Sequence, residues 1–334
     1  MSTIELFAIG NAIVDQEFQV SDAFLAQQQL QKGTMQLTDG TTQAQLHDQL
    51  HATQQYKGQA SGGSAANTTF AFAALGGKAF YGCRVGQDRL GQLYLNGLNE
   101  AHIATAQQSI CEGVTGTCMV LITPDTERTM HTFLGTTADL SIQEIDYDTL
   151  AQAKWLYIEG YLSTSDSARQ AVLKAREVAK ASNLQVALSL SDPAMVQYAR
   201  AGLEELLADG VDLLFCNEQE ALLFTDTKHV NDAVTQLLQK NKTVVVTLGE
   251  NGTLVATQNE TFHLEGRKVQ AVDTNGAGDA FAGAFLYALQ QGQTLEQAAE
   301  LAVLISSEVV TQFGPRLSLE KYAKLAQKLP TDVV

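Results

Sequence analysis

The segment Asp273-Thr274-Asn275-Gly276-Ala277-Gly278-Asp279 combines glycines with a carboxylate in a way that suits phosphoryl transfer. Glycine backbones can turn successive N–H groups toward one point, and the helix predicted to follow, with its small residues over 282–289, adds a partial positive charge at its N-terminus. Such a turn can hold a phosphate. Asp279 would repel that phosphate, so its presence needs another function, and general-base activation of a hydroxyl that attacks the phosphate is one. The helix N-terminus also favours an ionised Asp279, as a base must be.

Two other interpretations of this segment remain open. Asp is common in the first turn of helices because a negative charge there is favourable, without any catalytic role. A dinucleotide-binding turn would need a third glycine where Phe281 stands, and it normally opens an early β-α-β unit rather than lying near residue 276 of 334. The pattern G-x-x-x-x-G-K-[ST] does not occur in the sequence, which argues against a P-loop.

The second half of the chain contains the elements that would position this segment. From residue 153 on, apolar runs alternate with amphipathic stretches. Continuous apolar strands alternating with helices predict an α/β fold, a mainly parallel sheet covered on both faces in three α/β/α layers. The predicted strands are 155–158, 185–189, 211–216, 243–248 and 269–272, and the predicted helices lie near 165–181, 193–208, 218–224 and 231–240. In such sheets ligands bind at the carboxyl ends of the strands.

Polar residues follow several of these strands. Asn217 and Glu220 are three positions apart at a helix start, so both can face one point, and Glu220 could hold Mg²⁺ directly or through water. The same spacing also fits a simple helix cap. A glycine turn, 247–252, ends the next strand.

The N-terminal part of the chain also places polar residues and a glycine turn after an apolar strand. A short apolar strand, 4–9, stops before Asn11, and an extended stretch leads to Asp15, at a usual place for ligand contacts. A second glycine turn, 59–67, opens another helix, where exposed N–H groups and the Asn67 amide could bind the hydroxyls of a polar ligand. Close packing of that helix on the sheet explains the same small residues.

A smaller β-region is predicted outside this alternation. The β-rich runs 113–123 and 128–134 flank the turn 123–126, which is a hairpin signal. Together with residues 16–38 they predict a small separate sheet.

The composition limits the class of protein. With 334 residues, 45% of them hydrophobic, the chain can bury one large core, and a single α/β domain over 1–334 is predicted. A net charge of −16 argues against nucleic acid or an anionic membrane surface as a partner. The four cysteines form no C-x-x-C pair, and no apolar run approaches the ~20 residues of a membrane helix. Both features predict a cytoplasmic protein with reduced thiols.

These motifs together resemble the ribokinase-like (PfkB) family of ATP-dependent carbohydrate and nucleoside kinases. The most specific match is Asp273-Thr274-x-Gly276-Ala277-Gly278-Asp279, supported by Gly62-Gly63 with Asn67 and by Asn217-x-x-Glu220, all in family order. The resemblance covers nearly the whole chain. It implies an α/β/α sandwich with a small β-sheet lid over the acceptor site, formed here by roughly 15–40 and 110–137.

The resemblance implies the phosphoryl-transfer roles. Asp279 would deprotonate the acceptor hydroxyl, and Arg128 would close over the transferred phosphate from the lid. Charge on the transferring phosphoryl group would be stabilised by the N–H groups of Gly276, Ala277 and Gly278.

The resemblance also implies ATP as phosphate donor and Mg²⁺ as cofactor. Asn217 and Glu220 would order Mg²⁺ and phosphate, with the ion held by Glu220 through water, and a monovalent cation such as K⁺ could lie beside the loop of Asp273. The residues implied to border the nucleotide are Asn217, Thr247, Gly249 and Gly252.

Within the family, the N-terminal third is most similar to the adenosine kinases. Gly10-Asn11-x-x-x-Asp15, Tyr81-Gly82-Cys83 and Thr115-Gly116-Thr117-Cys118 carry this similarity. It implies that Asp15 binds ribose hydroxyls and that Tyr161 lies against the purine. The other residues implied to line the acceptor site are Asn11, Gly63, Ser64, Asn67 and Asn275.

The sequence therefore predicts an enzyme, a monomer or a homodimer, that transfers the γ-phosphate of ATP to a primary hydroxyl, the 5′-OH of adenosine. One alternative changes the acceptor to a sugar such as ribose, fructose or 2-keto-3-deoxygluconate. Another alternative is a non-catalytic nucleoside-binding relative. The intact Asp279 and glycine turn speak against that second alternative, because a binding protein needs no base there.

Overall fold

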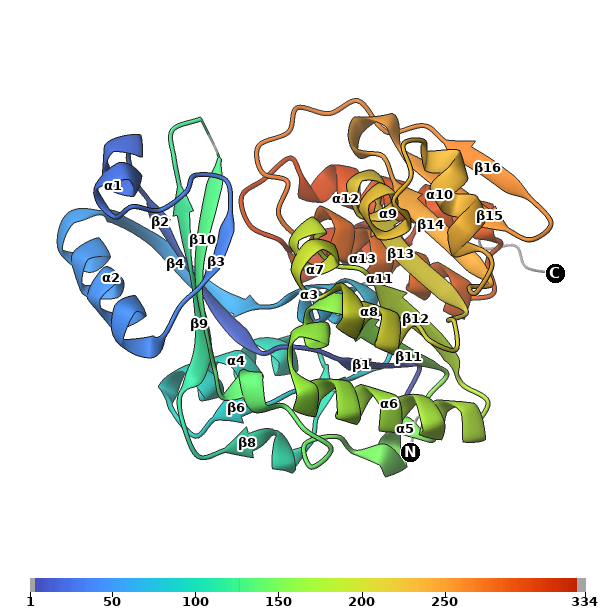
Figure 1. Cartoon of the computed structure of the whole chain (residues 1–334), viewed down its shortest axis with the longest axis horizontal. Coiled ribbons are helices and arrows are strands. Elements are labelled where there is room, and N and C mark those ends of the chain that lie inside the picture. Colours follow the sequence, from blue (N-terminus) through green and yellow to red (C-terminus); the bar gives the residue numbers. More distant parts are fainter. Residues whose placement is uncertain (1–3, 126, 329–334) are drawn as a thin grey trace.

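The computed structural model describes residues 4–125 and 127–328. The ends of the predicted domain, 1–3 and 329–334, and position 126 in the predicted lid lie outside the described residues. Figure 1 shows two sheets, a large one with helices on both faces and a small one that stands beside it.

The large sheet has nine strands in the order β16-β15-β14-β13-β12-β11-β1-β5-β7. The parallel strands are β1 (Leu6–Ile9), β5 (Ala79–Gly82), β7 (Ala104–Thr105), β11 (Trp155–Glu159), β12 (Gln185–Ser189), β13 (Leu213–Asn217) and β14 (Thr243–Thr247). An antiparallel hairpin, β15 (Thr253–Thr257) and β16 (Thr261–Leu264), extends one edge. The predicted mainly parallel sheet is confirmed. Its central strands β1, β5 and β11 are buried on both faces, which fits their apolar sequences, and Glu159 at the end of β11 is the one charged residue in them.

Helices cover both faces of the large sheet. Along β1 the side chains alternate, so that Leu6 and Ala8 pack into one helical layer while Phe7 and Ile9 pack into the other. The first layer contains α3 (Ser64–Ala74), α4 (Arg89–Glu100), α11 (Ala277–Gln290), α12 (Leu295–Val309) and α13 (Leu319–Ala326). The second contains α5 (Tyr147–Leu150), α6 (Asp166–Ala181), α7 (Pro193–Tyr198), α8 (Arg200–Leu206), α9 (Glu218–Thr225) and α10 (Val230–Leu237).

The close packing of α3 on α11 matters for the site. Gly283 of α11 lies so near to α3 that a Cβ there would be 2.3 Å from the Thr68 carbonyl oxygen. Small side chains along this contact, such as Ala71 and Ala284, are fully buried. The approach of the helices allows side chains from their N-terminal turns to meet.

The small sheet has five strands in the order β3-β10-β9-β2-β4. These are β2 (Ile13–Gln19), β3 (Met35–Leu37), β4 (Gln55–Gly62), β9 (Thr115–Ile122) and β10 (Arg128–Gly135). Two helices, α1 (Asp22–Gln27) and α2 (Gly40–Thr53), cover one face of this sheet. In their shared core, Leu50 of α2 packs with Phe18 of β2 and Met119 of β9. The alternate residues of the strands, including Ile13, Cys118 and Val120, form the face that borders the cavity described below.

Several elements differ from the sequence-based expectation. No strand forms at 269–272, and that expectation was wrong. Residues 267–271 are exposed and pair with no strand of either sheet, so the apolar Val269 and Ala271 are not buried. The helix predicted over 193–208 is split at Ala199 into α7 and α8. Strand β4 was not expected in the lid. Its sequence is largely polar, half of its residues are exposed, and it shows no apolar alternation from which a strand could be predicted.

Shorter elements complete the fold. They are the strands β6 (Val85–Gly86) and β8 (Ile110–Cys111) and the 3-10 helices η1 (Gln107–Ser109), η2 (Thr136–Asp139), η3 (Gly160–Thr164) and η4 (Gly249–Asn251). Within residues 4–125 and 127–328, no helix has the length and apolar character needed to cross a membrane.

Candidate active site

A cavity of about 400 Å³ lies between the small sheet and the carboxyl-terminal strand ends of the large sheet. Many of the residues predicted for the site line it, although they come from distant parts of the sequence. They are Asn11, Asp15, Gly63, Ser64, Asn67, Tyr161, Asn217, Glu220, Thr247, Asn275, Gly276, Gly278 and Asp279. The predicted residues outside its lining are Ala277, Arg128, Gly249, Gly252 and Asp273.

The glycine turn at the head of α11 forms one end of the cavity. Gly276 is the N-cap of this helix at a φ of 72°, and it has no side chain that could cap the first turn. A Cβ at Gly276 would lie 2.4 Å from the Cβ of Pro315, so the position requires glycine. By contrast, a Cβ at Gly278 would meet nothing within 4 Å. The first-turn N–H groups of a helix lack intrahelical acceptors, so this turn is open to an anion.

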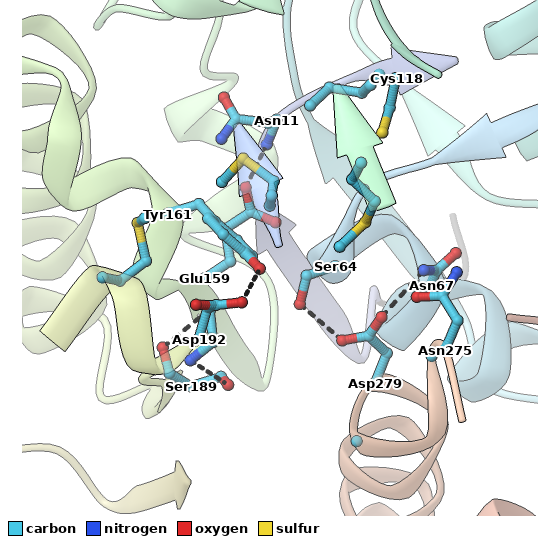
Figure 2. A pocket seen from close by; sticks show the side chains of 18 of the residues that line it. Asn11, Ser64, Asn67, Cys118, Glu159, Tyr161, Ser189, Asp192, Asn275 and Asp279 are labelled. Carbon is cyan, nitrogen blue, oxygen red and sulfur yellow. Dashed lines mark hydrogen bonds between the residues drawn. The ribbon is translucent and has the colours of Figure 1, made fainter. Parts of the chain in front are cut away.

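Asp279 lies in this first turn and is held by two residues of α3. Ser64 Oγ donates to Asp279 Oδ1 at 2.7 Å, and Asn67 Nδ2 donates to Asp279 Oδ2 at 3.0 Å (Figure 2). Burial raises the pKa of Asp279 to about 6, while the bonds from Ser64 and Asn67 oppose this rise. The carboxylate is therefore ionised at neutral pH but close enough to its pKa to accept a proton.

The turn before α3 also depends on a glycine. Gly63 has a φ of 97°, and a Cβ there would lie 2.5 Å from the carbonyl oxygen of Asn11. This close approach places Asn11, Ser64 and Asn67 around the same cavity.

Asn11 and Asp15 line the side of the cavity nearest to β2. The Asn11 side chain is fixed from behind, since its Oδ1 accepts from Thr137 Oγ1 at 3.2 Å, and its backbone carbonyl accepts from the Tyr81 hydroxyl at 3.0 Å. Burial raises the pKa of Asp15 to about 7, with nearby Arg316 acting in the opposite direction. A Cβ at Gly62 would lie 2.3 Å from Asp15 Oδ2, so glycine is needed on the neighbouring strand.

Glu159 is a site residue that the sequence interpretation missed. Its fully buried carboxylate accepts from the backbone N–H of Asn11 and from that of Ala65, both at 2.7 Å. It thereby ties the end of β1 to the start of α3. Burial raises the pKa of Glu159 to about 7. The sequence does contain a sign of this role, because a carboxylate ends an otherwise apolar strand just before Gly160.

The start of α9 forms the opposite side of the cavity. Asn217 and Glu220 make the capping box that was left open as an alternative. Asn217 Oδ1 accepts from Glu220 N at 2.8 Å, and the Glu220 carboxylate accepts from Asn217 N at 3.0 Å and from Asn217 Nδ2 at 2.6 Å. Both residues also line the cavity, so capping and ligand contact do not exclude each other. Burial and, less strongly, Asp192 and Asp279 raise the pKa of Glu220 to about 7.

A second polar group missed from the sequence follows β12. The Tyr161 hydroxyl donates to Asp192 Oδ2 at 3.3 Å, and Asp192 also caps α7 (Figure 2). Ser191 has a φ of 72°, which is uncommon for a residue with a side chain. Ser191 Oγ accepts from Gly160 N at 2.7 Å, so this group joins the ends of two neighbouring strands.

Arg128 and Asp273 pair with each other outside the cavity lining. The Asp273 carboxylate accepts from the Arg128 guanidinium, from Gly314 N at 2.8 Å and from Asn275 N at 2.9 Å. Arg128 Nη2 also lies 3.9 Å from Glu17 Oε1. In this arrangement Arg128 holds β10 against the glycine turn, and its guanidinium does not reach over the cavity. Among the residues that the structure describes, no cluster of three or more His, Cys, Asp or Glu is placed to hold a metal ion.

Comparisons with known proteins agree with this geometry. The family model for pfkB family carbohydrate kinase matches residues 34–322. The structure of a probable sugar kinase from Rhizobium etli CFN 42 is 34% identical, with a TM-score of 0.90 over 98% of this chain and 99% of that chain. The structure of adenosine kinase from Sinorhizobium meliloti is also 34% identical, with a TM-score of 0.89 over 97% of this chain and 100% of that chain. Adenosine kinase from Saccharomyces cerevisiae is 28% identical over 96% of this chain and 98% of that protein.

Proposed function

The chain belongs to the pfkB family of carbohydrate kinases, phosphotransferases that act on hydroxyl groups with ATP as donor, and we propose that its acceptor is the 5′-hydroxyl of adenosine. The position of Asp279 supports phosphoryl transfer to a hydroxyl. Asp279 lines the cavity and lies in the first turn of α11, so a candidate base adjoins a candidate phosphate site. The resemblance to adenosine kinases at up to 34% identity supports the acceptor class.

The composition of the cavity wall is the observation that favours a nucleoside over a free sugar as the acceptor. The small sheet contributes a mostly apolar wall, whereas Asn11 and Asp15 supply polar atoms at its margin. A purine has two apolar faces to cover and a ribose has hydroxyls to bind, so one ligand would satisfy both surfaces. A free sugar would leave the apolar wall without a partner. The apolar side chains of this wall are Ile13, Met35, Leu37, Val120, Met130 and Leu134.

The proposed reaction is an in-line transfer. The acceptor hydroxyl donates a hydrogen bond to Asp279, which takes the proton as the oxygen attacks the γ-phosphorus of ATP. One P–O bond forms to the acceptor, and the bond to the β,γ-bridging oxygen breaks, so that ADP leaves. The N–H groups of the turn formed by Gly276, Ala277 and Gly278 stabilise the negative charge of the group in transfer. Movement of the small sheet as a lid would exclude water, a competing acceptor.

The residues at the α9 end of the cavity fit a magnesium ion. Glu220 and Asp192 line this part of the cavity. Burial raises the pKa of Glu220 to about 7, and repulsion from Asp192 and from Asp279 at the head of α11 adds to this rise. A bound cation would relieve this repulsion. Glu220 would hold Mg²⁺ through water while its capping bonds persist. When bound with ATP, the ion neutralises phosphate charge.

The surroundings of Asp273 do not fit the monovalent cation expected there. Its carboxylate already accepts hydrogen bonds from Arg128, Gly314 and Asn275. A potassium ion would have to share this carboxylate with a guanidinium, and like charges that close repel each other.

The defining experiment measures ADP release from Mg²⁺-ATP with a panel of adenosine, inosine, guanosine, ribose, fructose and 2-keto-3-deoxygluconate. Turnover with adenosine at micromolar concentration is expected. The control is 5′-deoxyadenosine, which keeps the base and the vicinal hydroxyls but lacks the attacking oxygen, so it should inhibit without turnover. Turnover with a sugar alone would refute the nucleoside proposal and favour the resemblance to the probable sugar kinase.

The two glycines of the turn provide a matched pair of variants. Gly276→Ala is expected to lower the free energy of unfolding by at least about 1–2 kcal/mol, because a side chain is strained at φ 72° and would meet Pro315. Gly278→Ala should fold at least as stably, since its Cβ meets nothing within 4 Å and alanine favours helices. Its methyl group should nevertheless reduce kcat by about 10- to 100-fold by displacing the phosphate. Urea unfolding measures the stability of both variants, and ADP release measures their turnover. Normal turnover of Gly278→Ala would contradict the proposed anion site.

The rate should also depend on pH. Because burial raises the pKa of Asp279 to about 6, the base is lost as the pH falls through that value. We expect kcat, measured with both substrates saturating, to decline below about pH 6 and to level off above pH 7. A flat profile down to pH 5 would mean that proton transfer to Asp279 does not limit turnover.

A further inference from the structure

Arg316 reaches the site from a segment far from the motifs. It lies between α12 and α13, and its guanidinium is held on several sides. Nε donates to Asn67 Oδ1 at 2.8 Å and Nη1 donates to Ser61 Oγ at 2.9 Å. The guanidinium also lies 4.6 Å from the centre of the Phe70 ring. These contacts connect the C-terminal segment to β4 and α3.

The contact with Asn67 determines which way its amide points. The two ends of an amide have nearly the same shape, so packing alone does not distinguish them. A guanidinium can only donate, so the Asn67 oxygen must face Arg316. The Nδ2 group then faces Asp279 and donates to its Oδ2 at 3.0 Å. With the amide reversed, two oxygens would meet and the base would lose a donor.

Arg316 also brings a positive charge to this part of the site. It lowers the pKa of Asp279 against the effect of burial, after the larger contributions of the bonds from Ser64 and Asn67. It has the same effect on Asp15. Arg128 also lowers the pKa of Asp15, but its guanidinium pairs with Asp273, and of the two arginines only Arg316 acts on Asp279.

We infer that Arg316 is a positioning residue for the catalytic base: it fixes the Asn67 amide so that its N–H faces Asp279, and its charge favours the ionised carboxylate. The inference rests on the proposed function, in which Asp279 takes the proton of the acceptor. Arg316 itself need not touch either substrate. It acts through Asn67, so its removal should change both the pH at which the base works and the rate when the base is ionised.

The experiment compares kcat–pH profiles of Arg316→Gln, Arg316→Lys and a control, Arg176→Gln. Arg176 is a partly buried arginine of α6 that donates to the carbonyl oxygens of Leu206 and Gly210, outside the cavity lining. Arg316→Gln should move the acid limb upward by about one pH unit and lower the plateau about tenfold. Arg316→Lys should restore the position of the limb, because it keeps the charge, but not the full plateau. Arg176→Gln should lower Tm without moving the limb.

A double-mutant cycle separates this inference from the function on which it rests. In an Asp279→Asn background, Arg316→Gln should reduce the residual kcat little further, since both changes act on one group. Near-normal turnover of Asp279→Asn alone would refute the proposed function. Low turnover of Asp279→Asn together with an unmoved acid limb in Arg316→Gln would refute only the role of Arg316. If Arg316→Gln does not fold, Arg316→Lys decides, and an unchanged plateau in that variant would overturn the positioning role.

Discussion

Replacing Asp279 by Asn is expected to lower kcat with adenosine by about 10² to 10⁴, the usual effect of removing a general base. Asn keeps the size of the side chain and can still accept from Asn67 while it donates to Ser64 Oγ, so the geometry should survive. The measurement is ADP release under saturating Mg²⁺-ATP. The KM for ATP should change much less than kcat, because in the proposed site the phosphate is bound by the backbone of the turn and not by the Asp279 side chain.

Stability measurements distinguish this loss from misfolding. The pKa of Asp279 in the folded chain, about 6, lies above its ordinary value of 3.8, so the ionised form is less stable in the folded protein than in the unfolded one. The corresponding contribution to stability is present below pH 4 and is lost as the pH rises through 6. Asn carries no charge, so Asp279→Asn should unfold at the same or a higher temperature than wild type at pH 7.5. A lower Tm would indicate that the network around Ser64 and Asn67 has been disturbed.

A matched control addresses the simplest alternative, that Asp279 only complements the helix dipole. Asp232 is an exposed aspartate that occupies the same third position of its helix, α10. Asp232→Asn should leave kcat at its wild-type value. If Asp279→Asn also kept a near-normal rate, Asp279 would be equivalent to Asp232, and the role of base would have to be abandoned.

Asp15→Ala is expected to reduce kcat/KM for adenosine by about 10² to 10³, because the hydroxyls of the bound acceptor would lose their partner in a partly enclosed site. The KM for ATP should change only a few-fold, since Asp15 lies on β2, on the side of the cavity away from Asn217. Equal losses for both substrates would show that the acceptor has been assigned to the wrong side of the cavity.

The ionisation of Asp15 adds a second test of the same residue. Burial raises its pKa to about 7, so adenosine should bind more tightly as the pH rises through 7 if the carboxylate form binds the hydroxyls. Asp15→Asn should retain part of the affinity and lose this dependence. Glu17→Ala, two residues along the same strand but outside the cavity lining, should change the KM for adenosine far less.

The sequence predicted the central part of this fold well because its signals are local. The apolar runs at 155–158 and 185–189 are the strands β11 and β12, and the glycine turn before Asp279 does open a helix, α11. Each signal depends on a few neighbouring residues: an unbroken apolar run, a glycine at positive φ, or a cap such as Asn217 with Glu220. Strand β4 was missed because an edge strand with polar residues carries no such signal.

Other parts of the site depended on where distant residues meet. Glu159 accepts a hydrogen bond from a residue 148 positions away, and Arg316 donates to one 249 positions away. The pairing of Arg128 with Asp273, which spans 145 positions, is a third contact of this kind. No periodicity or motif encodes such pairs.

The sequence by itself determined most strands and helices of the large sheet, the glycine turns and the candidate base, since each follows from the conformational preferences of a short stretch. Only the tertiary structure decided how that base is held and which charges surround it. The strand order of the large sheet brings β1 beside β11, and the close packing of α3 on α11 brings Ser64 and Asn67 to Asp279. The physical reason is that hydrogen bonds and pKa values depend on distances of a few ångströms, and these are set by packing between segments that are not neighbours in the chain.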